Sequence, residues 1–367
     1  TYEFEVSKYD EQGQEINYTI GEKDLNNIFY TAQNSSVSGN MQEGYTITNT
    51  FEVPDEKVSI KVIKNWIDTA EQKDKRPAEI TLILTGNSIT VEQIPEEYRT
   101  VEETLTNTIN ANPENADEWI YTFSNLPKYD NYGNEITYTV TEKMDNKFYA
   151  QTETTGNMEE GYRITNTFQV PEETIEVPVT KVWDDNGNSA GRRPGEITVK
   201  VTGTSTAEIE EATEENGIYT LTKEQEISVD NKVGNDESRW TYTFTGLPKY
   251  DGNGNEIEYV VDEGETNEFY QKVSTDQETR TITNKFVVPG EKVKVRGTKE
   301  WNDNNNVAGK RPTNVTLQIK NGNEVVAEQV VNEGNNWTYE FEVSKYDEQG
   351  QEINYTADEV DLENTYY

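Results

Sequence analysis

The chain repeats itself, and one short segment marks the repeats. It reads YTITNTF at Tyr45–Phe51, YRITNTF at Tyr162–Phe168 and TITNKF at Thr281–Phe286. Alternate side chains of a β-strand point to opposite faces, so in this segment the isoleucine, asparagine and final phenylalanine share one face. An asparagine that faces a hydrophobic core needs a polar partner, and the rest of the repeat has to supply it.

The other motifs follow in a fixed order. A strand ending in Lys-x-Trp precedes an Arg-Pro pair, an aromatic strand, a Lys-Tyr-Asp turn, a strand ending in Glu and finally the Ile-Thr-Asn strand. This order predicts four domains, two of them complete: repeat 1 (residues 1–53, a C-terminal part), repeat 2 (54–170), repeat 3 (171–288) and repeat 4 (289–367, an N-terminal part). Short linkers around a proline predict semi-rigid joints and a linear array.

Each segment is short, alternates apolar and polar residues, and is bounded by Gly, Pro, Asn or Asp. No helical period persists, so the fold class is predicted to be all-β, with tandem immunoglobulin-like β-sandwich domains. Polar insertions at about residues 87–118 and 204–237 are expected to form surface loops or an added edge hairpin.

The composition excludes several classes of function. A net charge of −38 disfavours nucleic acid and anionic membranes as partners, and no apolar run is long enough to span a bilayer. The absence of cysteine and histidine removes disulfides, thiolate zinc sites and the commonest general base. Residues 184–188 and 303–306 resemble calcium loops only superficially, because the bidentate glutamate is missing. No metal and no cofactor is expected.

Strand parity identifies partners for the asparagines. The residues that it places on the core face are Lys64, Lys181 and Lys299 on the first strands, Glu142 and Glu263 on the glutamate strands, and Asn166 and Asn284 on the last strands. Burial favours the neutral forms of lysine and glutamic acid, and a neutral amine is a nucleophile. Two outcomes are open from the residues alone: an uncrosslinked buried ion pair, which is the commoner arrangement, or a Lys–Asn isopeptide bond.

The motifs together resemble the collagen-adhesin B-type (Cna-B) domain of Gram-positive surface proteins and pilins. The resemblance covers all four repeats and implies inverse immunoglobulin-like sandwiches with autocatalytic isopeptide bonds between first and last strands. It pairs Lys64 with Asn166, assisted by Glu142, and Lys181 with Asn284, assisted by Glu263. The equivalents in the partial repeats are Glu22, Asn49, Lys299 and Glu359. With the resemblance included, cross-linking is the favoured prediction.

The resemblance also implies an extracellular location on the bacterial cell wall and a function as the repetitive stalk of an adhesin or fibre. The alternative is an adhesive module that binds host matrix or another cell surface through its insertions. Expected partners are neighbouring repeats, with other copies in a fibre or a host matrix protein as further candidates. No enzyme activity on an external substrate is expected. Residues 1–19 and 338–356 are identical, and we expect a cut from a longer array rather than completion by a second chain.

Overall fold

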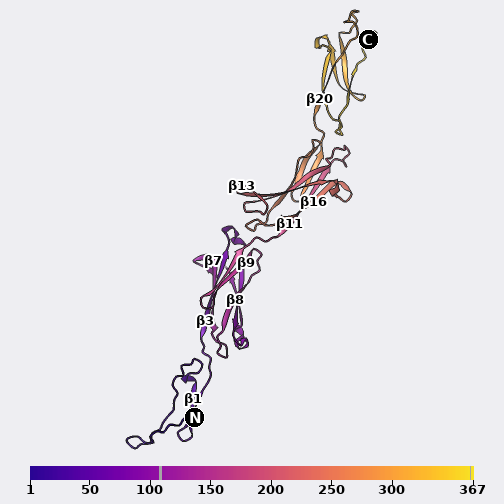
Figure 1. Ribbon diagram of the computed structural model, residues 1–367. Helices are drawn as coiled ribbons and strands as arrows, with labels where there is room; N and C mark the ends of the chain where they lie inside the picture. The colour runs from indigo at the N-terminus through magenta and orange to yellow at the C-terminus, as the bar shows by residue number, and fades with distance from the viewer. Residues whose placement is uncertain (107–109, 364) are drawn as a thin grey trace. The chain divides into compact units, whose positions relative to one another are not determined.

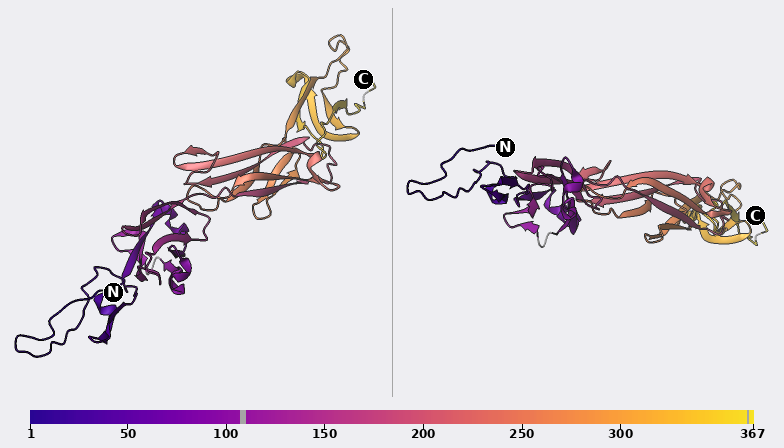
Figure 2. Two further views of the ribbon diagram at one scale, coloured as in Figure 1. Left: turned by 60° about the horizontal axis from the view of Figure 1, so that its bottom comes forward. Right: turned by 90° about the horizontal axis from the view of Figure 1, so that it is seen from below.

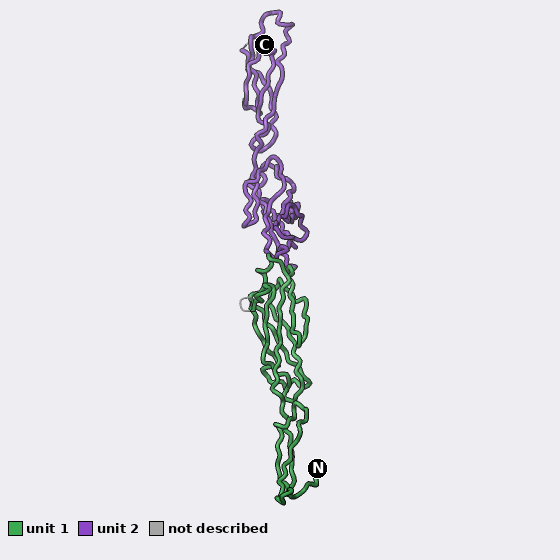
Figure 3. Tube along the Cα trace, turned by 90° about the vertical axis from the view of Figure 1, so that its left-hand side faces the viewer, with its two compact units in different colours: residues 1–171 green, residues 172–367 purple. Residues whose placement is uncertain are grey.

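A computed structural model of the chain describes residues 1–106, 110–363 and 365–367 (Figure 1). Two compact units, Thr1–Pro171 and Glu172–Tyr367, divide the chain (Figure 3). Strands make up nearly all of the regular structure, and the short 3-10 turns are Ala32–Asn34, Ala70–Lys75, Val91–Gln93, Glu96–Tyr98, Val229–Asn231 and Glu333–Asn335. Among the described residues, no helix has the length and apolar character needed to cross a bilayer.

Repeat 2 is a sandwich of two sheets. The larger sheet has the order β6-β7-β3-β10-β9, formed by Ala111–Asn112, Asn115–Pro127, Lys57–Ile67, Gly161–Phe168 and Tyr149–Asn157. The smaller sheet has the order β5-β4-β8, formed by Thr100–Thr106, Glu79–Asn87 and Thr137–Lys143. The first strand β3 and the last strand β10 are parallel neighbours, so the first and last strands of the repeat lie side by side and run in the same direction.

Repeat 3 has the same plan. Its larger sheet has the order β15-β16-β11-β19-β18, formed by Lys232–Val233, Asp236–Pro248, Thr174–Asp184, Thr281–Phe286 and Tyr270–Asp276. Its smaller sheet has the order β13-β14-β12-β17, formed by Thr213–Glu215, Ile218–Ser228, Glu196–Ser205 and Tyr259–Glu263. Here too the first strand β11 and the last strand β19 are parallel. The predicted fold class of tandem inverse immunoglobulin-like sandwiches is confirmed.

The cores follow from the alternation of the strands. In β3, Ile60 and Val62 are fully buried while the residues between them face outward. In β11, Val177 and Val179 occupy the same places and are also fully buried. The pattern that predicts strands from the sequence is therefore also the pattern that fills the space between the sheets.

The partial repeats contain fewer strands. Repeat 4 has the pair β20-β23, Lys292–Thr298 and Thr338–Ser344, and a second sheet of the order β22-β21-β24, formed by Glu324–Asn332, Asn314–Asn321 and Tyr355–Glu359. Repeat 1 has one hairpin, β1 (Ser35–Asn40) with β2 (Gly44–Asn49). The residues before this hairpin run as irregular chain, drawn in indigo (Figure 2).

The prediction for the long insertions is only partly right. An edge hairpin is present in repeat 3, where β13 pairs with β14. However, β5 and β14 pair along β4 and β12 as full members of the small sheets. Leu105 in β5 and the loop residue Ile94 are fully buried. The insertions thus add strands to the small sheets and contribute a few side chains to the cores. Residues 107–109 of the first insertion lie outside the described residues.

Candidate functional site

The strand register brings the predicted lysine, glutamate and asparagine together. In the parallel pair β3–β10, Lys64 lies opposite Ile164 and Asn166 lies opposite Trp66. Glu142 belongs to the facing sheet, where β8 pairs with β4. The lysine and asparagine therefore come from the first and last strands of one sheet, and the carboxylate reaches them from the other sheet.

In repeat 2 the three groups are in contact and shielded from water. Lys64 Nζ lies 3.5 Å from Glu142 Oε2, and their side chains are 0% and 2% exposed. Asn166, fully buried, donates from Nδ2 to Glu142 Oε1 at 2.6 Å. The carboxylate of Glu142 thus contacts both the amine and the amide, which is the arrangement that proton transfer between them requires.

In repeat 3 the same groups meet with a different alignment. Lys181 Nζ lies 3.0 Å from Glu263 Oε2, with side chains 0% and 3% exposed. These two atoms nonetheless lack hydrogen-bond alignment, and neither polar atom of the buried Asn284 side chain has a hydrogen-bond partner. Buried polar groups without partners are rare and costly, so the burial of the Asn284 amide beside the other two groups calls for a physical explanation.

Burial changes the acidity of both lysines. Desolvation lowers the pKa of Lys64 to about 8, against the opposing effect of the Glu142 charge. Desolvation likewise lowers the pKa of Lys181 to about 8, opposed by Glu263. A lysine with such a pKa is partly neutral near physiological pH, and the neutral amine is the nucleophilic form.

An indole ring covers each lysine amine. The amine lies over the ring at a distance from its centroid of 4.2 Å for Lys64 and Trp66, 4.5 Å for Lys181 and Trp183, and 4.9 Å for Lys299 and Trp301. Since the ring is large and apolar, it excludes water from the amine and also attracts the protonated form.

Strand parity did not reveal a second polar network beside each site. Arg76 lies 5.7 Å from the centroid of Trp66 and forms a two-point ion pair with Asp68, whose Oδ2 also accepts from the hydroxyl of Tyr149. The same network is formed by Asp185, Arg193 and Tyr270, and by Asp303, Arg311 and Tyr367. The sequence carried a signal for it, because an aspartate follows each Lys-x-Trp tryptophan after one residue.

The partial repeats hold incomplete versions of the site. Asn49 Nδ2 in repeat 1 donates to Glu22 Oε1 at 3.3 Å. Lys299 and Glu359 in repeat 4 form an ion pair whose side chains are 24% and 25% exposed. Glu22 and Asn49 thus meet in repeat 1, and Lys299 and Glu359 meet in repeat 4. The lysine amines are fully buried in repeats 2 and 3, whereas the Lys299 side chain is 24% exposed.

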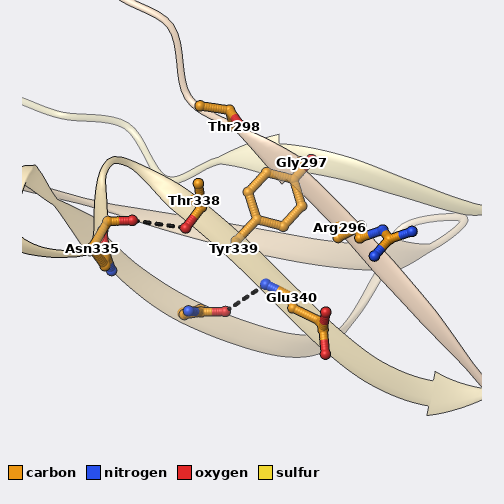
Figure 4. Close-up of a pocket in the computed structure, with 8 residues that line it drawn as sticks. Arg296, Gly297, Thr298, Asn335, Thr338, Tyr339 and Glu340 are labelled. Atoms are coloured by element: carbon orange, nitrogen blue, oxygen red, sulfur yellow. Dashed lines mark hydrogen bonds between the residues drawn. The ribbon is translucent and has the colours of Figure 1, made fainter.

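A groove in repeat 4 lies on β20 and β23. Figure 4 shows Tyr339 across Gly297, where an added Cβ would meet the tyrosine hydroxyl at 2.4 Å. Val62 and Val179 fill the equivalent position of repeats 2 and 3. The glycine therefore makes room for the tyrosine ring, and the groove is separate from the Lys299–Glu359 pair.

Comparison with known proteins identifies the repeats. The sequence profile of the Cna protein B-type domain matches residues 1–50, 60–167, 177–285 and 295–367. The chain belongs to this family. The Cna B-type match includes the first-strand lysines, the glutamates and the last-strand asparagines of repeats 2 and 3.

Several known proteins are similar to the chain. The collagen adhesin of Staphylococcus aureus is 33% identical over 367 residues, which are 100% of this chain and 26% of the adhesin. The chain thus spans about a quarter of that relative. A solved structure of two B repeat units of the S. aureus collagen binding protein is 29% identical, covering 98% of this chain and 81% of that chain, with a TM-score of 0.34. The major pilin T-13 of Streptococcus pyogenes is 15% identical, covering 63% and 97%, with a TM-score of 0.22.

Proposed function

We propose that the chain is part of the stalk of a bacterial cell-surface adhesin or fibre, in which an isopeptide bond locks each complete repeat. The observation that carries the proposal is the convergence of Lys64, Glu142 and Asn166 in a water-free core, repeated by Lys181, Glu263 and Asn284. An ion pair alone does not need a buried amide beside it, whereas amide formation does.

The chemistry follows from the contacts. Lys64 transfers a proton to Glu142, and the neutral Nζ attacks Cγ of Asn166. A Nζ–Cγ bond forms, the Cγ–Nδ2 bond breaks, and the protons that Nζ sheds pass through Glu142 to Nδ2, which leaves as ammonium. The hydrogen bond from Asn166 Nδ2 to Glu142 supports this route, because it connects the proton carrier to the leaving group.

The cross-link suits a structure under tension. A bond between residues 64 and 166 closes a loop of about 100 residues, and by analogy with a disulfide it stabilises the fold by on the order of 4 to 5 kcal/mol. Because β3 and β10 are adjacent and carry the two ends of repeat 2, force applied at those ends is borne by the covalent bond. The sandwich then need not unfold when the stalk is pulled.

The similarity to a collagen adhesin and to pilins supports a cell-surface location. The adhesive alternative is less well supported, because β5 and β14 belong to the sandwich sheets. Strand β13 and the exposed loops of the insertions remain as candidate contacts for a ligand. We therefore propose a structural role with no enzyme activity on external substrates.

Intact mass spectrometry tests the cross-link. We expect the purified chain to be lighter than its sequence mass by two ammonia molecules, one each for repeats 2 and 3. Lys64→Ala and Lys181→Ala should each reduce this mass deficit from two ammonia molecules to one. Lys299→Ala is the matched control, because repeat 4 lacks its asparagine and the deficit should stay at two. If the intact mass of the wild-type chain equals the mass calculated from its sequence, the isopeptide proposal is refuted.

A further inference from the structure

We propose that repeats 1 and 3 each carry a docking surface for the Lys-Tyr-Asp turn of the repeat that follows, and that this contact couples the stability of the two repeats in each compact unit. The surface is here called the docking surface and consists of Arg192, Glu268, Phe269 and Phe286 in repeat 3. Its occupant is the turn Lys345–Gln351 of repeat 4. Both lie in the unit Glu172–Tyr367.

The contact centres on the rings of Phe269 in repeat 3 and Tyr346 in the turn. Phe269 stacks on Phe286 with centroids 6.4 Å apart, and Tyr346 of the turn meets Phe269 edge-to-face at 5.2 Å. Phe269 is 7% and Tyr346 8% exposed, and Tyr346 packs with the core residues of repeat 3. Aromatic pairs in this geometry add stability beyond the area that they bury.

Polar groups of repeat 3 recognise the backbone and side chains of the turn. The Arg192 guanidinium lies 4.9 Å from the centroid of Phe269, and Nη2 donates to the Gly350 carbonyl at 2.6 Å and to Gln351 Oε1 at 3.2 Å. Gln351 donates back to the Ala190 carbonyl at 3.2 Å. The hydroxyl of Tyr346 donates to Glu268 Oε1 at 3.1 Å. Such directional bonds fix one orientation of the turn, which apolar contact alone would not.

Glycine is required in the turn for two reasons. Gly350 has a φ of +71°, and an added Cβ would lie 3.0 Å from Cε1 of Phe269. The chain needs the left-handed conformation to close the turn, and the phenylalanine needs the space. The docking surface therefore recognises a tyrosine followed four residues later by glycine.

The unit Thr1–Pro171 contains a second example. Phe29 of repeat 1 stacks on Phe51 at 5.7 Å and meets Tyr129 of repeat 2 edge-to-face at 5.5 Å. A Cβ on Gly133, four residues after that tyrosine, would lie 2.6 Å from Cε1 of Phe29. Repeat 1 lacks the segment that would supply an arginine like Arg192. The aromatic and glycine contacts therefore recur without the polar clamp.

The identical segment at the start of the chain shows that docking, not the turn itself, buries the tyrosine. Tyr9 corresponds to Tyr346 but is 53% exposed. Gly13 corresponds to Gly350, with a φ of +79°, and an added Cβ there would meet nothing within 4 Å. The same amino-acid sequence thus forms a free turn in repeat 1 and a docked turn in repeat 4.

Hydrogen exchange in the full chain tests the coupling, with the amides of β21 as the reporter for opening of repeat 4. We expect Tyr346→Ala to accelerate their exchange by about tenfold or more, because a buried aromatic contact at the centre of an interface is lost. Arg192→Gln should accelerate it by roughly three- to tenfold, and the double variant should show less than the product of the two effects. Exchange in β12 reports whether repeat 3 itself remains folded.

Two matched pairs decide the result. Each variant is compared with its equivalent in the identical segment, read in that segment's own repeat. Gly350→Ala should accelerate exchange in β21, whereas Tyr9→Ala should leave exchange in β2 of repeat 1 unchanged and Gly13→Ala should change it less than Gly350→Ala changes exchange in β21. Multiplicative effects of Tyr346→Ala and Arg192→Gln, or no effect of Gly350→Ala, would overturn the docking proposal. The outcome is independent of the cross-link, because repeat 4 has no asparagine strand and the intact mass is measured separately.

Discussion

Residues 1–19 and 338–356 have the same sequence and different structures. In repeat 4, Thr338–Ser344 is the strand β23, paired with β20, and Phe341 is 6% exposed. In repeat 1 the same letters form no strand before the turn, and Phe4 is 76% exposed. The strand therefore depends on its neighbour, which the sequence of the segment does not contain.

The turn that follows the strand is the same in both copies. Tyr9 bridges to Glu15 as Tyr346 bridges to Glu352. The carboxylate of Asp10 accepts from the amides of residues 12 and 14, and that of Asp347 from residues 349 and 351. Turn structure is thus local, since its hydrogen bonds close within the segment, whereas strand structure is not.

The largest expected effect comes from removing the aromatic ring that is buried in only one copy. Phe341→Ala should destabilise repeat 4 by about 3 to 5 kcal/mol, because a buried phenylalanine is lost from a small core. Phe4→Ala should change stability by less than about 0.5 kcal/mol. Hydrogen exchange under denaturant measures Phe341→Ala in β21 of repeat 4 and Phe4→Ala in β2 of repeat 1, and equal effects would show that the two copies have the same structure in solution.

The lysine sites allow the same comparison between complete and incomplete packing. Lys64 is fully buried, whereas Lys299 is 24% exposed. Burial lowers the pKa of Lys64 from its ordinary 10.5 to about 8, and we expect Asn166→Ala, which cannot cross-link, to leave the lysine buried. Between these values the unfolded state binds more protons, so the stability of repeat 2 should rise with pH through this window, by on the order of 3 kcal/mol.

The control for this prediction is Lys64→Met in the same Asn166→Ala background. It removes the titrating amine but leaves the tyrosines, whose hydroxyls also ionise at high pH. We compare the free energy of unfolding of the two variants from about pH 7 to 11, a range that includes both lysine pKa values. The difference between the variants isolates the contribution of the lysine. A difference that stays flat across pH would mean that Lys64 is not desolvated in the folded repeat.

Much of the structure could be predicted from strand parity. The core-facing positions of Lys64 and Asn166 are confirmed, because alternation on a single strand fixes which face a side chain occupies. The edge strand β5 was missed, since its sequence TVEETLT is polar apart from Val101 and Leu105, and only Leu105 is buried. Such a strand is recognisable only from its pairing with β4.

The parts of the site that could not be predicted depend on contacts between distant segments. Tyr149 reaches Asp68 from a different strand, and nothing in either neighbourhood specifies that meeting. The docking of Tyr346 on Phe269 likewise joins two repeats. Sequence periodicity gives the face of each residue but not the partner across a gap, so these contacts appear only when the sheets are assembled.

The smallest expected effect isolates one hydroxyl within the docked turn. Tyr346→Phe keeps the ring against Phe269 but removes the hydrogen bond to Glu268, so it should destabilise repeat 4 by about 0.5 to 1.5 kcal/mol. Tyr9→Phe in the identical segment should have no measurable effect, because that turn is undocked. If Tyr9→Phe accelerates exchange in β2 of repeat 1 as much as Tyr346→Phe accelerates exchange in β21, the hydroxyl acts through the turn itself. If only Tyr346→Phe matters, the carboxylate of repeat 3 recognises the turn, and orientation as well as burial distinguishes the two copies.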